Sequence, residues 1–224
     1  MKVKCPCTES KAIEIRRQRN PDTAFSPGLH FGDLFGKTYI EIVDAFRARI
    51  YERYIDPANH CNENNKYNFT VLILCCVILD LLSQYFYGKE SSGKLTFIQF
   101  IREYIPESGE QITPSIESCY FKKEWTEETI NDAAEGFYHC FRSGVVHSAM
   151  VLEYGRINEE HPNIVHINKW GKGKREIVIN PSLLLSRLIE IFDDYIAKLR
   201  NNEQPLKDCF KKKFAFDFGV EIDG

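Results

Sequence analysis

The chain has 224 residues, enough for one well-buried domain, and its 43% hydrophobic and 27% charged residues are typical of a globular protein. A formal net charge of -3 excludes binding to nucleic acid through overall positive charge, so any such contact needs a local basic patch. The amino-terminal sequence has no apolar segment of signal-peptide length. We therefore expect a cytoplasmic protein whose eight cysteines are mostly free thiols.

Residues 1–32 are expected to form an irregular arm, because "NPD" and "SPG" are turn signals. Cys5 and Cys7 in "KCPC" are spaced like half of a zinc site, but a second pair with similar spacing is missing. We therefore expect neither a metal nor another cofactor.

Two helices are predicted in the first half of the chain. Residues 33–55 carry apolar side chains three or four positions apart, which indicates an amphipathic helix that ends ahead of Pro57. Residues 68–87 are apolar nearly all round, interrupted by Asp80, and Gly88 is a stop signal. We interpret this second helix as the centre of a bundle and not as a membrane span.

The second half begins with a short helix over residues 95–105, with Thr96 as its N-cap, and a long helix over 125–155, with Thr126 as its N-cap. The helical spacing of apolar residues then gives way to two short strand-like runs, which predict a β-hairpin over about 163–180. An amphipathic helix from Pro181 to Arg200 is predicted to follow it. The tail, 206–224, alternates loosely and suggests a short edge strand. The predicted fold is mainly α, a bundle of four to five helices over 33–205 with the hairpin inserted before the last long helix.

The predicted helix over 125–155 carries polar groups among apolar ones. Its core stripe is Phe137, Phe141, Val145, Ala149 and Leu152, and beside it lies a row of small residues, Cys140, Gly144 and Ser148, that would let another helix approach closely. A third row is His139, Ser143 and His147. Arg142 lies five residues before His147, about 140° around a regular helix. Either Gly144 loosens the helix, or a symmetric dimer brings the arginine of one chain to the histidine of the other.

The stretch "FRSGVVH", residues 141–147, is an R-x4-H element with a polar residue after the arginine. It resembles the HEPN superfamily, whose signature is an arginine and a histidine a few residues apart on a late helix of a bundle. The apolar helix with Asp80 and the segment "FIQFIREYI" fit the same pattern.

The resemblance implies a metal-independent endoribonuclease that acts as a homodimer, of a kind common in toxin–antitoxin and phage-defence systems. RNA would be its substrate, an antitoxin or regulatory protein a partner, and no membrane would be involved. Arg142 would hold the scissile phosphate and His147 would exchange the proton. Ser143 would be the third site residue, where the family usually has Asn, Asp or His.

An alternative interpretation is a non-catalytic HEPN-like dimeric module that binds a nucleotide, RNA or a protein. Arg142 and His147 would then only make structural hydrogen bonds. A basic surface beside Arg142 would favour the enzyme, with Lys169, Lys172, Lys174 and Arg175 as candidates, although a solvated turn explains these four residues equally well.

Overall fold

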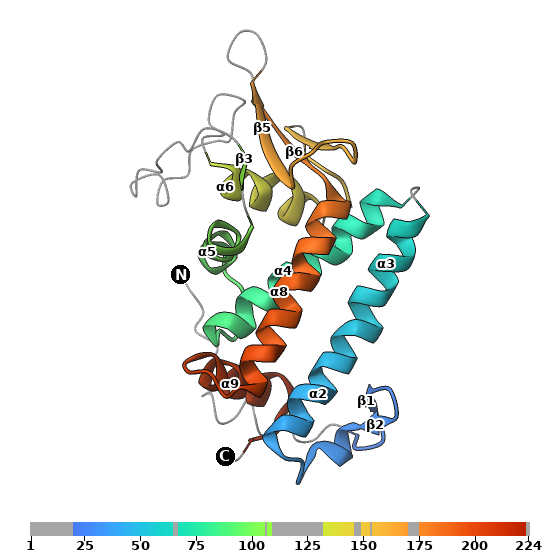
Figure 1. Cartoon of the computed structure of the whole chain (residues 1–224), viewed down its shortest axis with the longest axis vertical. Coiled ribbons are helices and arrows are strands. Elements are labelled where there is room, and N and C mark those ends of the chain that lie inside the picture. Colours follow the sequence, from blue (N-terminus) through green and yellow to red (C-terminus); the bar gives the residue numbers. More distant parts are fainter. Residues whose placement is uncertain are drawn as a thin grey trace, which may run out of the picture. The chain divides into compact units, whose positions relative to one another are not determined.

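The computed structural model describes residues 20–64, 67–105, 107–108, 132–145, 149–152, 154–169 and 175–222. These residues are mostly helical, as predicted (Figure 1). Their contacts divide the chain into two compact units. Unit 1 comprises Met1–Asp56, Leu81–Ser92 and Phe192–Gly224, and unit 2 comprises Pro57–Asp80 and Gly93–Ile191. The predicted boundaries at residues 32 and 205 stay predictions.

The first predicted helix begins as α2 (Tyr39–Ile50) at Thr38, whose hydroxyl accepts the N–H of Glu41 while the Glu41 carboxylate accepts the N–H of Thr38. The predicted end before Pro57 is wrong. The helical hydrogen bonding continues through the π-helical segment η2 (Tyr51–Ile55) into α3 (Asp56–Glu63). The N–H of Asp56 donates to the carbonyl of Tyr51, five residues earlier, so this turn is wider than an α-helical turn. The wider turn directly precedes Pro57, which has no N–H to donate.

Unit 1 has an aromatic core. The sequence had suggested a short edge strand in the tail, and this prediction is wrong. The tail forms the helix α9 (Leu206–Phe218). Phe210 and Phe214 lie one turn apart on α9, and their rings contact Phe46 of α2 at centroid distances of 5.4 and 6.4 Å. Burial of these rings outweighs the loose alternation of the tail. The predicted arm likewise contains a short hairpin, β1 (Ala24–Ser26) and β2 (Leu29–His30), followed by η1 (Phe31–Leu34).

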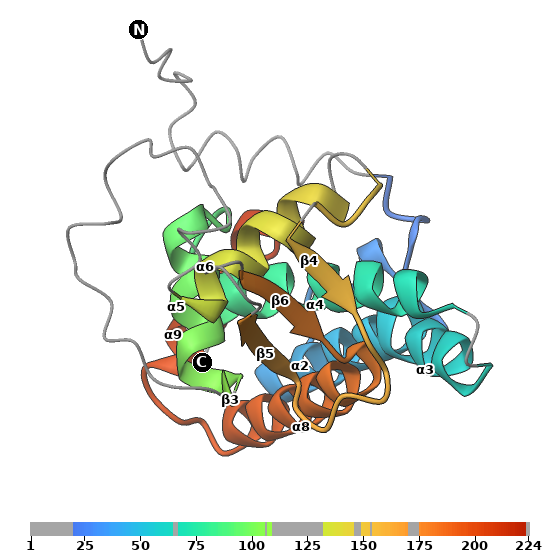
Figure 2. The same ribbon diagram turned by 90° about the horizontal axis from the view of Figure 1, so that it is seen from above.

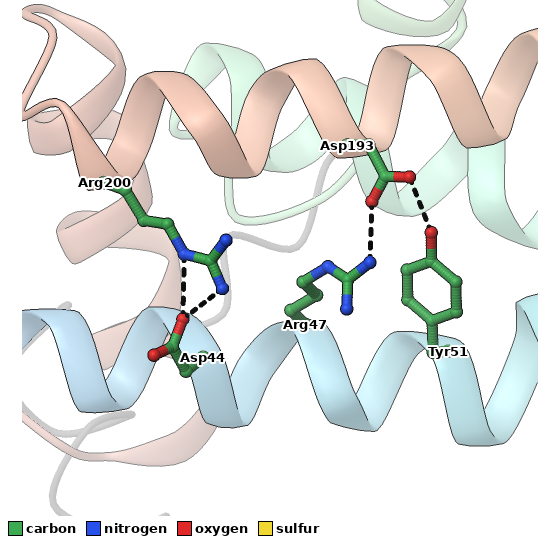
Figure 3. A network of polar contacts seen from close by, with 5 residues as sticks. All are labelled: Asp44, Arg47, Tyr51, Asp193 and Arg200. Atoms are coloured by element: carbon green, nitrogen blue, oxygen red, sulfur yellow. Dashed lines mark hydrogen bonds and ion pairs between the residues drawn. The ribbon is translucent and has the colours of Figure 1, made fainter.

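Helix α2 also contacts the carboxyl-terminal half of α8 (Pro181–Arg200) through polar side chains in unit 1 (Figure 3). Asp193 accepts hydrogen bonds from Arg47, at 3.2 Å, and from the hydroxyl of Tyr51, at 2.7 Å. Asp44 accepts from Nε of Arg200 at 2.9 Å. These contacts fix the register between two helices that are distant in sequence.

Unit 2 contains the helices around the motif. The predicted helix over residues 68–87 is confirmed as α4 (Asn68–Tyr87), of which the part up to Asp80 belongs to unit 2. Gly88, in unit 1, follows the helix with the left-handed φ of 58°. Helix α5 (Lys94–Tyr104) begins at Gly93 with no side-chain cap, so the assignment of Thr96 as N-cap is wrong. The next described helical segments are α6 (Ala133–Phe137) and the π-helical η4 (Tyr138–Ser143). The predicted cap Thr126 lies outside the described residues.

The predicted hairpin is confirmed as the antiparallel pair β5 (Val165–Lys169) and β6 (Arg175–Ile179). It belongs to a four-stranded sheet of order β3-β5-β6-β4, in which β3 (Glu107–Ser108) and β4 (Gly155–Ile157) pair in parallel with their neighbours. These two short strands were not predicted. Figure 2 shows α6 beside β5 and β6, which it contacts.

Helix α4 has the length and composition of a membrane span, and no other helix in the described residues does. In its most apolar window 56% of the residues are buried inside the protein, including Leu72, Cys76 and Leu79. This burial is typical of the core helix of a soluble protein.

Candidate functional site

The segment that carries Arg142 is built on the packing of α5 against α6 and η4. Asp132 caps α6 by accepting the backbone N–H of Ala134, and its carboxylate also pairs with Arg102 of α5. The ring of Phe97 contacts those of Phe137 and Tyr138 at 6.0 and 5.5 Å. The backbone before Arg142 is therefore held by a cap, an ion pair and aromatic contacts.

Arg142 lies in η4 and pairs with Asp80 of α4. Its Nε and Nη2 both donate to the same carboxylate oxygen, Oδ2, at 3.2 and 3.0 Å. The two side chains are only 16% and 20% exposed. On another side the guanidinium carbon lies 5.5 Å from the ring centre of Tyr138, within range of a cation–π contact. Arg142 is thus held in a partly buried position.

The same two segments carry two buried thiols, Cys76 on α4 and Cys140 in η4. Burial and the charge of Asp80 raise the pKa of Cys76 well above its usual range, with the charge of Arg142 opposing them. Burial raises the pKa of Cys140 to about 11. Both groups are therefore protonated at neutral pH and are poor nucleophiles and metal ligands in that form.

The described residues contain no group of three or more His, Cys, Asp or Glu side chains placed to hold a metal ion. Cys5 and Cys7 lie outside the described residues. The absence of a metal requirement stays a prediction for an experiment with a chelator.

Arg142 and Ser143 are consecutive residues at the end of η4, where Ser143 is half-buried. His147 lies outside the described residues, so its position relative to Arg142 stays a prediction. His139 is half-buried. Burial and the charge of Lys94 lower the pKa of His139 to about 4, so this histidine is neutral at pH 7.

The predicted helix does not extend to Gly155. Phe137, Phe141 and Val145 of the predicted core stripe are buried, but Ala149 is exposed and Leu152 is 38% exposed. Residues 149–152 are not helical, and Ala149 has a left-handed φ of 51°. The expectation that these two residues continue the stripe is therefore wrong.

The chain folds back over the row of small residues instead. The N–H of Leu152 donates to the carbonyl of Cys140 at 3.1 Å, and a Cβ on Gly144 would lie 2.6 Å from the carbonyl oxygen of Met150. Cys140 and Gly144 thus admit the chain's own backbone, and the expectation that they admit another helix is wrong. Ser148 lies outside the described residues.

Two of the four candidate basic residues on the hairpin belong to its described strands. Lys169 and Arg175 are placed at the ends of β5 and β6 by their backbone, and Lys172 and Lys174 lie outside the described residues. Whether these cations form a patch beside Arg142 stays a prediction.

A hollow of about 570 Å³ lies in unit 1 and not at the motif. Lys37, Tyr39 and Lys207 are among its lining residues, and Arg142, Ser143 and Asp80 are not. It therefore adds nothing to the candidate site in unit 2.

The sequence had marked Asp80 as the residue that interrupts the apolar helix, but it had not paired Asp80 with Arg142 and had not singled out Tyr138. Two signals were available. Asp80 is the only charged residue in the 20 residues of α4, and Tyr138 precedes Arg142 by one helical turn.

Comparisons of the chain with protein-family models, with curated proteins and with solved structures found no match.

Proposed function

We propose that the chain is a cytoplasmic endoribonuclease of the HEPN type, a homodimer that cleaves RNA without a metal ion. The HEPN-like arrangement of its helices is part of the same proposal. A role in a toxin–antitoxin or phage-defence system, with an antitoxin or regulatory protein as partner, follows from the family resemblance alone.

One observation carries the proposal: the motif arginine is held in a partly buried position, where it pairs with Asp80 and lies over the ring of Tyr138. A guanidinium is a planar cation with several donors, which suits the oxygens of a phosphodiester. A cation fixed before the substrate arrives stabilises developing negative charge without having to reorganise. The position of Arg142 thus fits a phosphate-binding role.

The chemistry needs one further group. The 2′-hydroxyl of the ribose attacks phosphorus, the bond to the 5′ oxygen breaks, and the proton lost from the hydroxyl is balanced by one gained at the leaving oxygen. His147 would exchange these protons, because an imidazole titrates near neutral pH. The products are a 2′,3′-cyclic phosphate and a 5′-hydroxyl.

The non-catalytic module is the second candidate function. The pairing that orients Arg142 also favours this alternative, because a partly buried ion pair between η4 and α4 is a sufficient structural reason for an arginine here. Activity, and not contact geometry, separates the two candidates.

The homodimer is supported by the family resemblance and no longer by the small residues. Cys140 and Gly144 are covered by residues of the same chain, so a dimer would use a different surface of unit 2.

The test is cleavage of a labelled, mixed-sequence single-stranded RNA in excess chelator. We expect the wild type to cleave and His147→Ala to lose about a hundredfold or more in rate, since general acid–base catalysis contributes this much. His60→Ala is the matched control, because His60 is an exposed histidine of α3 in the same unit, and it should retain full activity. Equal cleavage by the wild type and His147→Ala would contradict the role of His147.

A further inference from the structure

We infer that Asp80 is a positioning residue for Arg142, one that fixes the plane of the guanidinium for the phosphate. The inference deepens the proposed function and rests on it. It assigns a role in the reaction to a residue of α4 that lies 62 positions away from Arg142 in sequence.

The geometry of the pair supports a positioning role. Nε and Nη2 lie on one edge of the guanidinium, and both donate to the same oxygen of Asp80. Rotation about the bond between Cδ and Nε would carry Nη2 and the Nε proton away from Oδ2, so both hydrogen bonds oppose this rotation. Two bonds on one edge therefore define the plane of the group as well as its position.

Asp80 stands on a tightly packed part of α4. Its neighbours Cys76 and Leu79 on α4 are completely buried. A carboxylate on such a helix has few alternative positions, because closely packed side chains around it cannot rearrange independently. By contrast, Arg142 sits at the end of a π-helical segment, immediately before the chain folds back at residues 149–152.

The long side chain of Arg142 also has many rotamers when it is not held. A free arginine must give up rotamer freedom each time it binds a phosphate. The contacts with Asp80 and with the Tyr138 ring restrict the rotamers of Arg142 before any substrate binds. We therefore expect the loss of Asp80 to lower kcat, the rate of the substrate-bound enzyme. A misplacement of about 1 Å at a reacting group can lower the rate about a hundredfold.

The test compares steady-state cleavage of the labelled RNA, in chelator, by the wild type, Asp80→Asn, Arg142→Ala and the double variant. Asp80→Asn keeps the shape of the side chain and removes its charge. The matched control is Asp44→Asn, because Asp44 also accepts from an arginine, Arg200, but lies in unit 1. Thermal melts of all variants report folding.

We expect Asp80→Asn to lower kcat about 10- to 100-fold and to leave KM within about threefold, while Asp44→Asn stays within about twofold of wild type. The double variant should be no slower than Arg142→Ala, because Asp80 acts only through Arg142. A purely structural role would instead lower activity in parallel with the melting temperature and add to the effect of Arg142→Ala.

A second readout needs no activity. The Nε–H resonance of Arg142, identified by its loss in Arg142→Lys, should exchange slowly with solvent in the wild type and fast in Asp80→Asn. If this resonance already exchanges fast in the wild type, Asp80 does not fix the guanidinium and the inference is wrong.

Three kinetic outcomes would overturn the inference. Unchanged kcat in Asp80→Asn, while Arg142→Ala is inactive, rejects positioning by Asp80 alone and leaves the ribonuclease proposal intact. A higher rate or tighter RNA binding in Asp80→Asn shows that the carboxylate masks Arg142. Absence of cleavage by the wild type contradicts the ribonuclease proposal and this inference together.

Discussion

Arg142 of the motif segment and Asp80 of the apolar helix α4 form an ion pair, with two guanidinium nitrogens on one carboxylate oxygen at 3.0 and 3.2 Å. Neither residue has another charged residue of its own helical segment to pair with, since Asp80 is alone in α4 and Arg142 is alone in η4. The pair therefore specifies which face of η4 meets α4.

The fold-back over the motif can be tested at Gly144. An alanine there would place its Cβ 2.6 Å from the carbonyl oxygen of Met150, so the backbone must shift. We expect Gly144→Ala to lower the free energy of unfolding by about 1–3 kcal/mol, although alanine is the better helix former. Gly93→Ala is the control, because a Cβ at Gly93 meets nothing within 4 Å, and it should cost less than about 1 kcal/mol. Equal effects in urea denaturation would show that residues 150–152 do not cover Gly144.

His139 predicts a dependence of stability on pH. Its pKa is lowered to about 4 in the folded protein, from an ordinary value of 6.5, first by burial and then by Lys94. Between these values the unfolded chain binds more protons than the folded one, so the contribution of His139 is fully present above pH 6.5 and lost as the pH falls towards 4. His139→Gln should therefore lose less of its free energy of unfolding between about pH 6.5 and 4 than the wild type does. The check is the NMR titration of the His139 ring: a midpoint near 6.5 would contradict the burial.

Much of the fold could be predicted from the sequence, because its patterns were long. The mostly apolar sequence of α4, the amphipathic period of α8 and the two strands β5 and β6 each repeat one signal several times. Two- and three-residue strands such as β3 and β4 repeat no signal, and they form only because the hairpin offers edges with which to pair.

The remaining errors also have physical causes. In the tail, Phe210 and Phe214 stand four residues apart, a helical spacing that the alternating "FAFDF" obscured. The non-helical backbone at residues 149–152 could not be read from the sequence, because Ala149 takes a left-handed φ that alanine does not favour. In the candidate site, the sequence supplied Arg142, but the partner that holds it depends on a contact between residues distant in sequence.

The buried lysine of unit 1 offers a test of its polar core. Lys213 is 3% exposed and donates to the carbonyl of Glu90 at 2.9 Å and to Asp217 at 2.8 Å. Lys213→Met should lower the free energy of unfolding by about 1.5–3 kcal/mol, because a hydrogen bond to a charged group is lost and its acceptors remain.

Lys198→Met is the control for this effect. Lys198 pairs with Asp194 with the same spacing of four residues, but both side chains are much more exposed. It should cost less than about 1 kcal/mol. Equal losses for the two variants in urea denaturation would show that the burial of Lys213 contributes nothing.

The proposed dimer is tested by light scattering of the purified chain at micromolar concentration. We expect a mass about twice the 26.1 kDa of one chain. Gly144→Ala should leave this mass unchanged if its effect is confined to the fold-back. A mass of one chain would contradict the dimer and require a site formed by a single copy.

The most direct test of the account is the cleavage of single-stranded RNA, in excess chelator, by the wild type, Arg142→Lys and Arg142→Ala, with the ends of the products analysed. The account predicts 2′,3′-cyclic phosphate ends from the wild type and a rate about a hundred- to a thousandfold lower for Arg142→Ala, the usual cost of losing a donor that stabilises the transition state. Arg142→Lys should recover little, because a lysine cannot place two donors on Asp80 and present a planar cation to the phosphate. Equal cleavage by the wild type and Arg142→Ala, both folded by circular dichroism, or no cleavage by the wild type, would contradict it.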